Sequence, residues 1–243
     1  PWHSAKDIED SKNTISSDKE FRRLWYGQWV TIEGAEWPES YFPDSIWFSD
    51  FPNNLILKVV TLDPTVGKGA RPGDYAAFIK LGVDRDCRLW VQAELTRNLT
   101  ATQQAERIVE ICREWLPDCA GIENNTFQDL IKIEAQRLAI QRGYIFPCYG
   151  INNRKVQKEL RIVRLTTHLA LGKVRVMDNE GGRLLVQQLR NFSMKQQPGM
   201  HDDGPDALEQ AVRLSNWFMV NKRPKHPDAQ PTQRLIPLAE LVG

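Results

Sequence analysis

Acidic side chains stand at three points of the chain where an apolar segment ends or a helix is expected to begin. Asp63 ends the β-branched run NLILKVVTLD and is followed at once by a proline. Glu123 ends the short apolar segment CAGIE. Asp202, Asp203 and Asp206 cluster in HDDGPDALEQAV, at the start of the predicted final helix. In open sheets with parallel strands, functional groups gather at the carboxyl ends of the strands, so these acids are candidates for one site.

The chemistry of such a site follows from charge repulsion. If residues 119–123 lie parallel to residues 54–63, Asp63 and Glu123 become neighbours, and Asp203 on the final helix completes a triad. Carboxylates this close stay ionised only if cations neutralise them. Oxygen ligands without Cys or His select Mg²⁺ or Mn²⁺, and two such ions about 4 Å apart can activate a water and stabilise the leaving oxygen of a phosphodiester. We therefore expect a two-ion phosphodiester hydrolase with these three residues as its catalytic acids.

Each acidic position also has an ordinary structural interpretation. An Asp before a proline is commonly a turn residue, and an Asp at a helix start is commonly a cap. Within the last cluster, Asp202 is predicted as the cap and Asp203 as the principal metal ligand. Asp206 lies three residues further along the same face, as a second carboxylate. If the helix starts one residue earlier, Asp202 and Asp206 converge instead. Asp74 and Asp202 are secondary acidic candidates.

The elements that must position these residues alternate along the chain. Three strand-like segments are followed by a helix, a strand, a helix, a strand and further helices, which predicts an α/β fold. Its mixed five-stranded sheet combines an antiparallel meander with parallel strands and has helices on both faces. The strands are expected at 54–63, 74–83, 87–96, 119–123 and 144–150, and the helices at 100–115, 126–142, 153–171, 180–190 and 203–221.

Composition limits the organisation of the chain. The 243 residues, 41% of them hydrophobic, suffice for one globular domain with appended segments. We expect a connector over residues 1–50, the domain over 51–223 and a Pro-rich tail over 224–243. Neither a signal peptide nor an apolar run long enough for a membrane span is visible, so no membrane partner is expected. The four cysteines lack CxxC spacing, which favours reduced thiols.

Basic residues concentrate in one segment, although the formal net charge is only +1. A helical wheel over residues 153–171 places an apolar stripe on one side and a basic row on the other. The predicted inward stripe consists of Val156, Leu160, Val163, Thr167 and Ala170, and the outward row of Arg154, Lys158, Arg161, Arg164 and His168. Such a row is often only a solvated surface. The near absence of acids in it favours phosphate contact by its four lysine and arginine residues. Lys68 and Arg71, in the Gly-rich loop after Asp63, are further DNA-contact candidates.

The acidic segments together resemble the nuclease motifs of tailed-phage large terminases. TLDPTVGKGARPGDYAAFI resembles the first motif, in which Asp-Pro is followed by a Gly/Lys loop and a second Asp-Tyr. GIENNTF resembles the second motif, and HDDGPDALEQAV the third, an Asp-Asp-x-x-Asp-Ala string. NRKVQKELRIVRLTTHLALGKVRV is similar to the family's basic helix followed by a short strand, and EFRRLWYGQWVTIEGAEWP to its ATPase–nuclease junction. The resemblance covers roughly residues 20–222.

This resemblance implies a ribonuclease-H-like fold and an endonuclease that cuts concatemeric viral DNA during packaging, with little sequence preference. Its implied partners are double-stranded DNA, a terminase small subunit, a portal and an ATPase domain absent from this chain, in the cytoplasm of a bacterial host. No GxxxxGK[ST] loop is present, because Ala70 follows Gly67-Lys68-Gly69. No ATPase activity is therefore expected. The alternatives are another ribonuclease-H-like enzyme, such as a transposase, integrase or junction resolvase, and a non-catalytic DNA-binding or assembly module.

Overall fold

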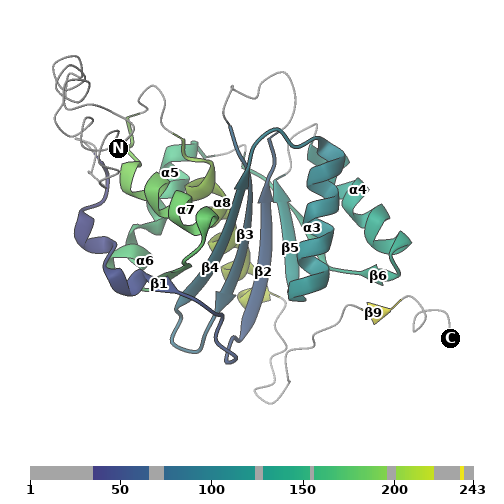
Figure 1. The fold of residues 1–243 in the computed structure, drawn as a ribbon, viewed down its shortest axis with the longest axis horizontal. Helices are drawn as coiled ribbons and strands as arrows, with labels where there is room; N and C mark the ends of the chain where they lie inside the picture. Colours follow the sequence, from purple (N-terminus) through teal and green to yellow (C-terminus); the bar gives the residue numbers. More distant parts are fainter. Residues whose placement is uncertain are drawn as a thin grey trace, which may run out of the picture.

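A mixed sheet of seven strands forms the centre of the protein (Figure 1). Its strand order is β1-β8-β4-β3-β2-β5-β7. The antiparallel meander consists of β2 (Leu57–Asp63), β3 (Ala76–Val83) and β4 (Leu89–Thr96), as predicted. The computed structural model describes residues 35–65, 74–123, 128–153, 156–195 and 201–221, together with the backbone of 236–237.

Parallel strands extend the meander on both sides. β5 (Cys119–Glu123) pairs with β2, and β7 (Cys148–Ile151) pairs with β5. On the other side β8 (Val174–Met177) pairs with β4, and β1 (Trp47–Phe48) pairs with β8. The predicted mixed sheet is confirmed, but the predicted number of five strands is too low. β1 has only two residues and β8 only four, too few to show a period of their own.

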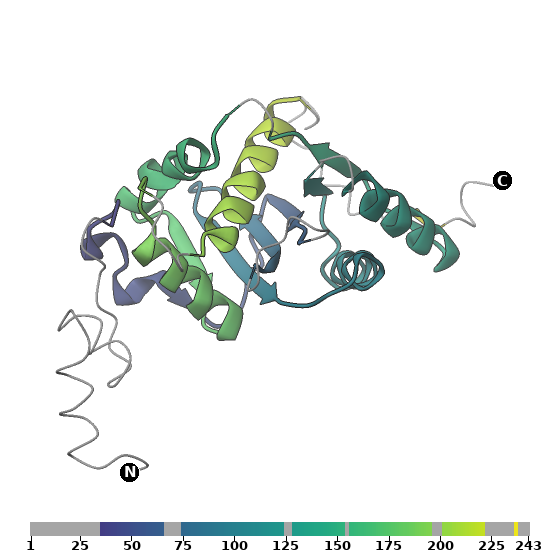
Figure 2. The same cartoon turned by 90° about the horizontal axis from the view of Figure 1, so that it is seen from above.

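Helices cover both faces of the sheet (Figures 1 and 2). Val59 and Val60, adjacent in β2, belong to different hydrophobic cores because successive strand side chains point to opposite faces. α3 (Ala101–Trp115) and α4 (Gln128–Gln141) pack over the core that contains Val60. α7 (Glu180–Asn191) and α8 (Asp203–Asn221) pack over the other. Burial of β2 and β5 on both faces explains their continuous apolar runs.

The predicted basic helix 153–171 begins later and is divided. It consists of α5 (Lys158–Ile162), the 3-10 turn η3 (Val163–Leu165) and α6 (Thr166–Ala170). The predicted inward stripe is wrong, because Leu160 is 49% exposed while Ile162, Leu165 and Leu169 are buried. A 3-10 turn has about three residues per turn, so it changes the phase that a continuous wheel assumes.

The described part of the predicted connector packs on the domain. Trp37, Phe42 and Ile46 are buried in the same core as α7 and α8, and two short 3-10 turns, η1 (Glu39–Tyr41) and η2 (Asp44–Ile46), precede β1. The boundary at residue 50 stays a prediction. Most of the predicted tail lies outside the described residues, except β9 (Ile236–Pro237), which pairs with β6 (Tyr144–Ile145). In the described parts of the chain, no helix combines the length and apolarity of a membrane span.

Candidate metal centre

Three carboxylates from distant parts of the chain meet at one edge of the sheet. Asp63 and Glu123 are the last residues of β2 and β5, which run parallel with Leu62 opposite Ile122. Asp206 belongs to the first turn of α8, which is fixed on β2 where the Thr61 hydroxyl donates to the Ala207 carbonyl at 3.1 Å. The three acids each offer an oxygen within 4.8 Å of the others.

Burial makes this group electrostatically costly without a cation. Asp63, Glu123 and Asp206 are only 9%, 8% and 2% exposed. Burial, and then the charge of Glu123, raise the pKa of Asp63 well above its usual range. Burial also raises the pKa of Asp206, to about 6. Without a bound cation, Asp63 therefore keeps its proton to a higher pH than an ordinary aspartate does.

Glu123 is the ionised partner of Asp63. Burial alone would raise the pKa of Glu123, but the hydrogen bond from Asp63, with the nearby Asn153 amide and Arg161 charge, outweighs burial and lowers it. The amide of Gln210 also donates to Glu123 Oε2, at 3.3 Å. Asp63 thus donates a hydrogen bond to Glu123, and a cation bound by both carboxylates would compete with that proton.

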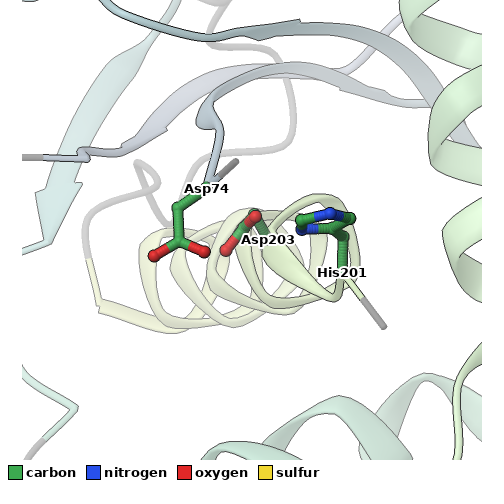
Figure 3. A group of neighbouring side chains, drawn as sticks. All are labelled: Asp74, His201 and Asp203. Atoms are coloured by element: carbon green, nitrogen blue, oxygen red, sulfur yellow. The ribbon is translucent and has the colours of Figure 1, made fainter. Parts of the chain in front are cut away.

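A second group lies at the start of α8 and contains Asp203. Asp74, His201 and Asp203 each offer a ligand atom within 4.8 Å of the others. Figure 3 shows the carboxyl groups of Asp74 and Asp203 side by side, with the His201 ring next to Asp203. Asp203 Oδ2 accepts a hydrogen bond from the Tyr75 backbone at 3.1 Å, and burial raises the pKa of Asp203.

Both groups border one cleft of about 260 Å³. The residues that line it are Asp63, Pro64, Thr65, Asp74, Tyr75, Glu123, Lys158, Arg161, Asp203 and Asp206. All four predicted metal ligands are therefore brought together in one cleft. The sequence predicted Asp203 as the third carboxylate beside Asp63 and Glu123, but in the structure the third member of this buried group is Asp206. The predicted cap, Asp202, directly precedes α8, and its Oδ1 accepts from Lys158 Nζ at 2.7 Å.

Two residues of the predicted basic row face these acids. Lys158 Nζ also lies 3.5 Å from Asp203 Oδ1. Burial lowers the pKa of Lys158, but Asp202 and the other nearby carboxylates raise it more strongly, so the amine stays charged. Arg161 Nη2 donates to both oxygens of Asp206, at 2.8 and 2.7 Å. The expectation that Arg161 points to solvent is wrong, because the ion pair with Asp206 draws its guanidinium inward.

Of the four remaining predicted DNA contacts, the structure describes only Arg164. Arg164 is half-exposed, and its Nη1 lies 3.3 Å from Glu209 Oε1. Lys68, Arg71 and Arg154 lie outside the described residues. Their predicted role in DNA binding stays a prediction.

Sequence reasoning missed four polar residues of the site: Asn153, Tyr75, His201 and Gln210. Gln210 could have been found, because it follows Asp206 by four residues and so shares its helix face. His201 directly precedes the Asp-Asp pair, but a single histidine beside acids was not a specific signal. Tyr75 belongs to the Asp-Tyr pair of the first motif, but nothing in that pair indicated that its backbone would donate to Asp203. Asn153 carries no such signal, because its place is set by the end of β7.

Comparison with known proteins identifies the fold. Residues 60–214 match the family described as the terminase RNase H-like domain. The structure resembles the phage P22 large terminase nuclease domain at 13% identity, with a TM-score of 0.52 over 74% of this chain and 91% of that one. It resembles the large terminase nuclease of thermophilic phage G20c at 18% identity, with a TM-score of 0.50 over 68% and 85%.

The HK97 bacteriophage large terminase is also similar, at 14% identity with a TM-score of 0.50. That similarity covers 87% of this chain but only 50% of the HK97 chain. No sequence among the curated proteins matches significantly. These likenesses confirm the predicted ribonuclease-H-like fold.

Proposed function

Because the chain belongs to the family of terminase RNase H-like domains, we propose that it is a metal-dependent endonuclease that cuts concatemeric viral DNA during genome packaging. The observation that carries this proposal is the buried group of Asp63, Glu123 and Asp206 at the wall of an open cleft. A domain that only bound DNA would have no use for three mutually repelling carboxylates in a buried position.

The donor set fits Mg²⁺ or Mn²⁺. The three acids supply only oxygen atoms, which hard divalent cations prefer. Arg161 occupies both Asp206 oxygens, but each carboxylate oxygen has two lone pairs and can accept a second partner. We propose Asp63, Glu123 and Asp206 as ligands, with Asp203 as a further ligand at the same cleft and two ions in all.

Divalent ions held there would polarise the phosphodiester and lower the pKa of a bound water. The protein's own contribution is to hold the carboxylates before the substrate arrives, since β2, β5 and α8 are packed together. In the overall reaction a water oxygen bonds to phosphorus and the bond from phosphorus to the leaving oxygen breaks. One water proton ends on the leaving oxygen, and the other stays on the new phosphate oxygen or passes to solvent, so the products are a hydroxyl and a phosphate monoester.

The proposed substrate is double-stranded DNA, contacted mainly through its phosphates. Lys68, Arg71, Arg154 and Arg164 are the proposed backbone contacts, and no described element presents a row of side chains suited to reading bases. Such contacts predict little sequence preference. We further propose that the domain works with an ATPase domain, a small terminase subunit and a portal in the host cytoplasm. The half-length match to the HK97 large terminase supports a longer assembly.

Incubation of the protein with supercoiled plasmid tests this proposal. Nicked and linear products should form with Mg²⁺ or Mn²⁺ and disappear with EDTA, while circular dichroism shows an unchanged fold. Ca²⁺ should support cutting poorly, because its looser coordination misplaces the attacking water. Robust cleavage in EDTA would exclude the proposed mechanism. A preference for four-way junctions over linear duplex would instead favour a junction resolvase.

A further inference from the structure

Lys158 occupies a distinctive position among the residues that line the cleft. It is the first residue of α5, and its ammonium bridges Asp202 and Asp203, at 2.7 and 3.5 Å, where α8 begins. Its side chain is 29% exposed, compared with 7% for Arg161. Of these two cations that line the cleft, Lys158 is therefore the one that solvent, and so an entering substrate, can more readily reach.

Arg161 is held by several buried contacts and is therefore not available to an entering substrate. Its guanidinium donates to both oxygens of Asp206 and to the backbone carbonyls of Asn153 and Val156. These contacts tie the segment before α5 to α8, so Arg161 could approach a substrate only by giving up a buried network. Lys158 differs because a lysine is a point charge on a flexible stem with three donors that can change partners without moving the backbone.

The charges in the cleft change when a divalent cation and a phosphodiester enter it, and this change alters the contacts that are favourable for Lys158. In the metal-free protein its partly exposed side chain supplies a counter-charge for the acids at the start of α8. A divalent cation on the same carboxylates repels that ammonium and weakens its hold on Asp203. A phosphodiester that enters at that moment brings negative oxygens into the cleft that Lys158 lines.

We propose that Lys158 is a catalytic residue that moves from Asp202 and Asp203 to a non-bridging oxygen of the scissile phosphate when cation and DNA enter. The proposal rests on the proposed nuclease function. The ammonium keeps all its protons and stabilises the negative charge that grows on the phosphate oxygens as water attacks. Lys158 thus has two opposed effects, since it competes with cations in the empty cleft and assists cleavage in the filled one.

Lys158→Gln tests this opposition. Without DNA, titration calorimetry should show Mn²⁺ binding about tenfold tighter, because one repelling charge is gone. At saturating Mn²⁺, single-turnover cleavage should fall about a hundredfold. DNA affinity measured in Ca²⁺ should change far less than the cleavage rate. Lys158→Arg keeps the charge, so it should retain wild-type Mn²⁺ affinity and recover part of the activity.

Arg137→Gln is the matched control, since it removes a positive charge from the exposed surface of α4, where Arg137 pairs with Glu134. It should change neither Mn²⁺ affinity nor cleavage. If Lys158→Gln binds Mn²⁺ no more tightly than wild type, or loses cleavage only as far as it loses DNA affinity, Lys158 is a structural clamp and the inference is overturned. A wild-type protein that cuts equally well with no cation overturns the metal-dependent mechanism, and one that cuts under no condition overturns the nuclease function; both results are separate from this one.

Discussion

Arg161 and Asp206, 45 residues apart in the chain, form a buried ion pair in which one guanidinium nitrogen lies within 2.8 Å of both carboxylate oxygens. The pair joins α5 to the first turn of α8. It therefore sets the position of the helix that brings Asp206 to Asp63 and Glu123. Because Asp206 is also a proposed metal ligand, one contact links the stability of the fold to the geometry of the site.

Breaking this pair should destabilise the protein. In Arg161→Gln the buried carboxylate loses its positive partner, which typically costs about 3–5 kcal/mol. Urea unfolding at pH 7 measures this loss. At pH 5 the loss should be smaller, because Asp206, with its pKa already raised to about 6, is then protonated and needs no counter-charge. Arg183→Gln, which removes an exposed ion pair with Asp178, should cost less than about 1 kcal/mol. A loss equal to that of the control would show that the pair is structurally unimportant.

The raised pKa values of Asp63 and Asp206 predict how stability depends on pH without metal. A carboxyl group that binds its proton more tightly when folded stabilises the protein below the unfolded pKa, near 4. That stabilisation is lost as the pH rises through the folded pKa. The unfolding free energy should therefore fall by about 1–3 kcal/mol between pH 5 and pH 8 in EDTA.

Asp63→Asn removes one of the two groups, so its stability should fall less over the same pH range and exceed that of wild type at pH 8. Urea unfolding in EDTA across this range measures both effects. An Asp63→Asn protein that is as pH-dependent as wild type, or less stable at pH 8, would show that Asp63 is a structural residue.

The convergence of Asp63 and Glu123 could be predicted because each ends an apolar strand, and the carboxyl ends of parallel strands meet at one edge. The strands of the meander were equally readable as apolar, β-branched runs, and α3 and α7 as amphipathic helices. The sequence did not show in the same way which acid of α8 lies beside Asp63 and Glu123. Asp203 and Asp206 share a helix face, and the choice between them depends on how α8 docks on β2.

The direction of Arg161 was beyond the reach of sequence patterns. A helical wheel treats an arginine as a solvent-facing residue, but a buried carboxylate from a distant helix reverses that preference. The break at η3 has the same origin, because tertiary packing of Ile162 and Leu165 overrides the regular period. Both errors concern contacts between segments that are far apart in the chain.

DNA binding by the Gly-rich loop after Asp63 gives a separate prediction. The double reversal Lys68→Glu with Arg71→Glu should weaken binding to all duplex sequences alike. Each phosphate contact releases counterions when DNA binds, so a protein with two fewer contacts releases fewer of them. The slope of log affinity against log salt should therefore become shallower by about two. Fluorescence anisotropy in Ca²⁺ at several salt concentrations measures it. An unchanged slope would move the DNA track to another part of the surface.

The initial rate of plasmid cleavage by charge-removing Asn variants, at one saturating Mn²⁺ concentration, tests the central claim most directly. Asp63→Asn and Asp206→Asn should each lower the rate at least a thousandfold, because the buried group loses a metal ligand. Asp206→Asn also loses the ion pair with Arg161, so circular dichroism must show that this variant is folded under the assay conditions. Asp203→Asn should fall between these and Asp202→Asn, which should retain the most activity because Asp202 lies outside the buried group. Near wild-type cleavage by Asp63→Asn would contradict the claim that this carboxylate centre hydrolyses DNA.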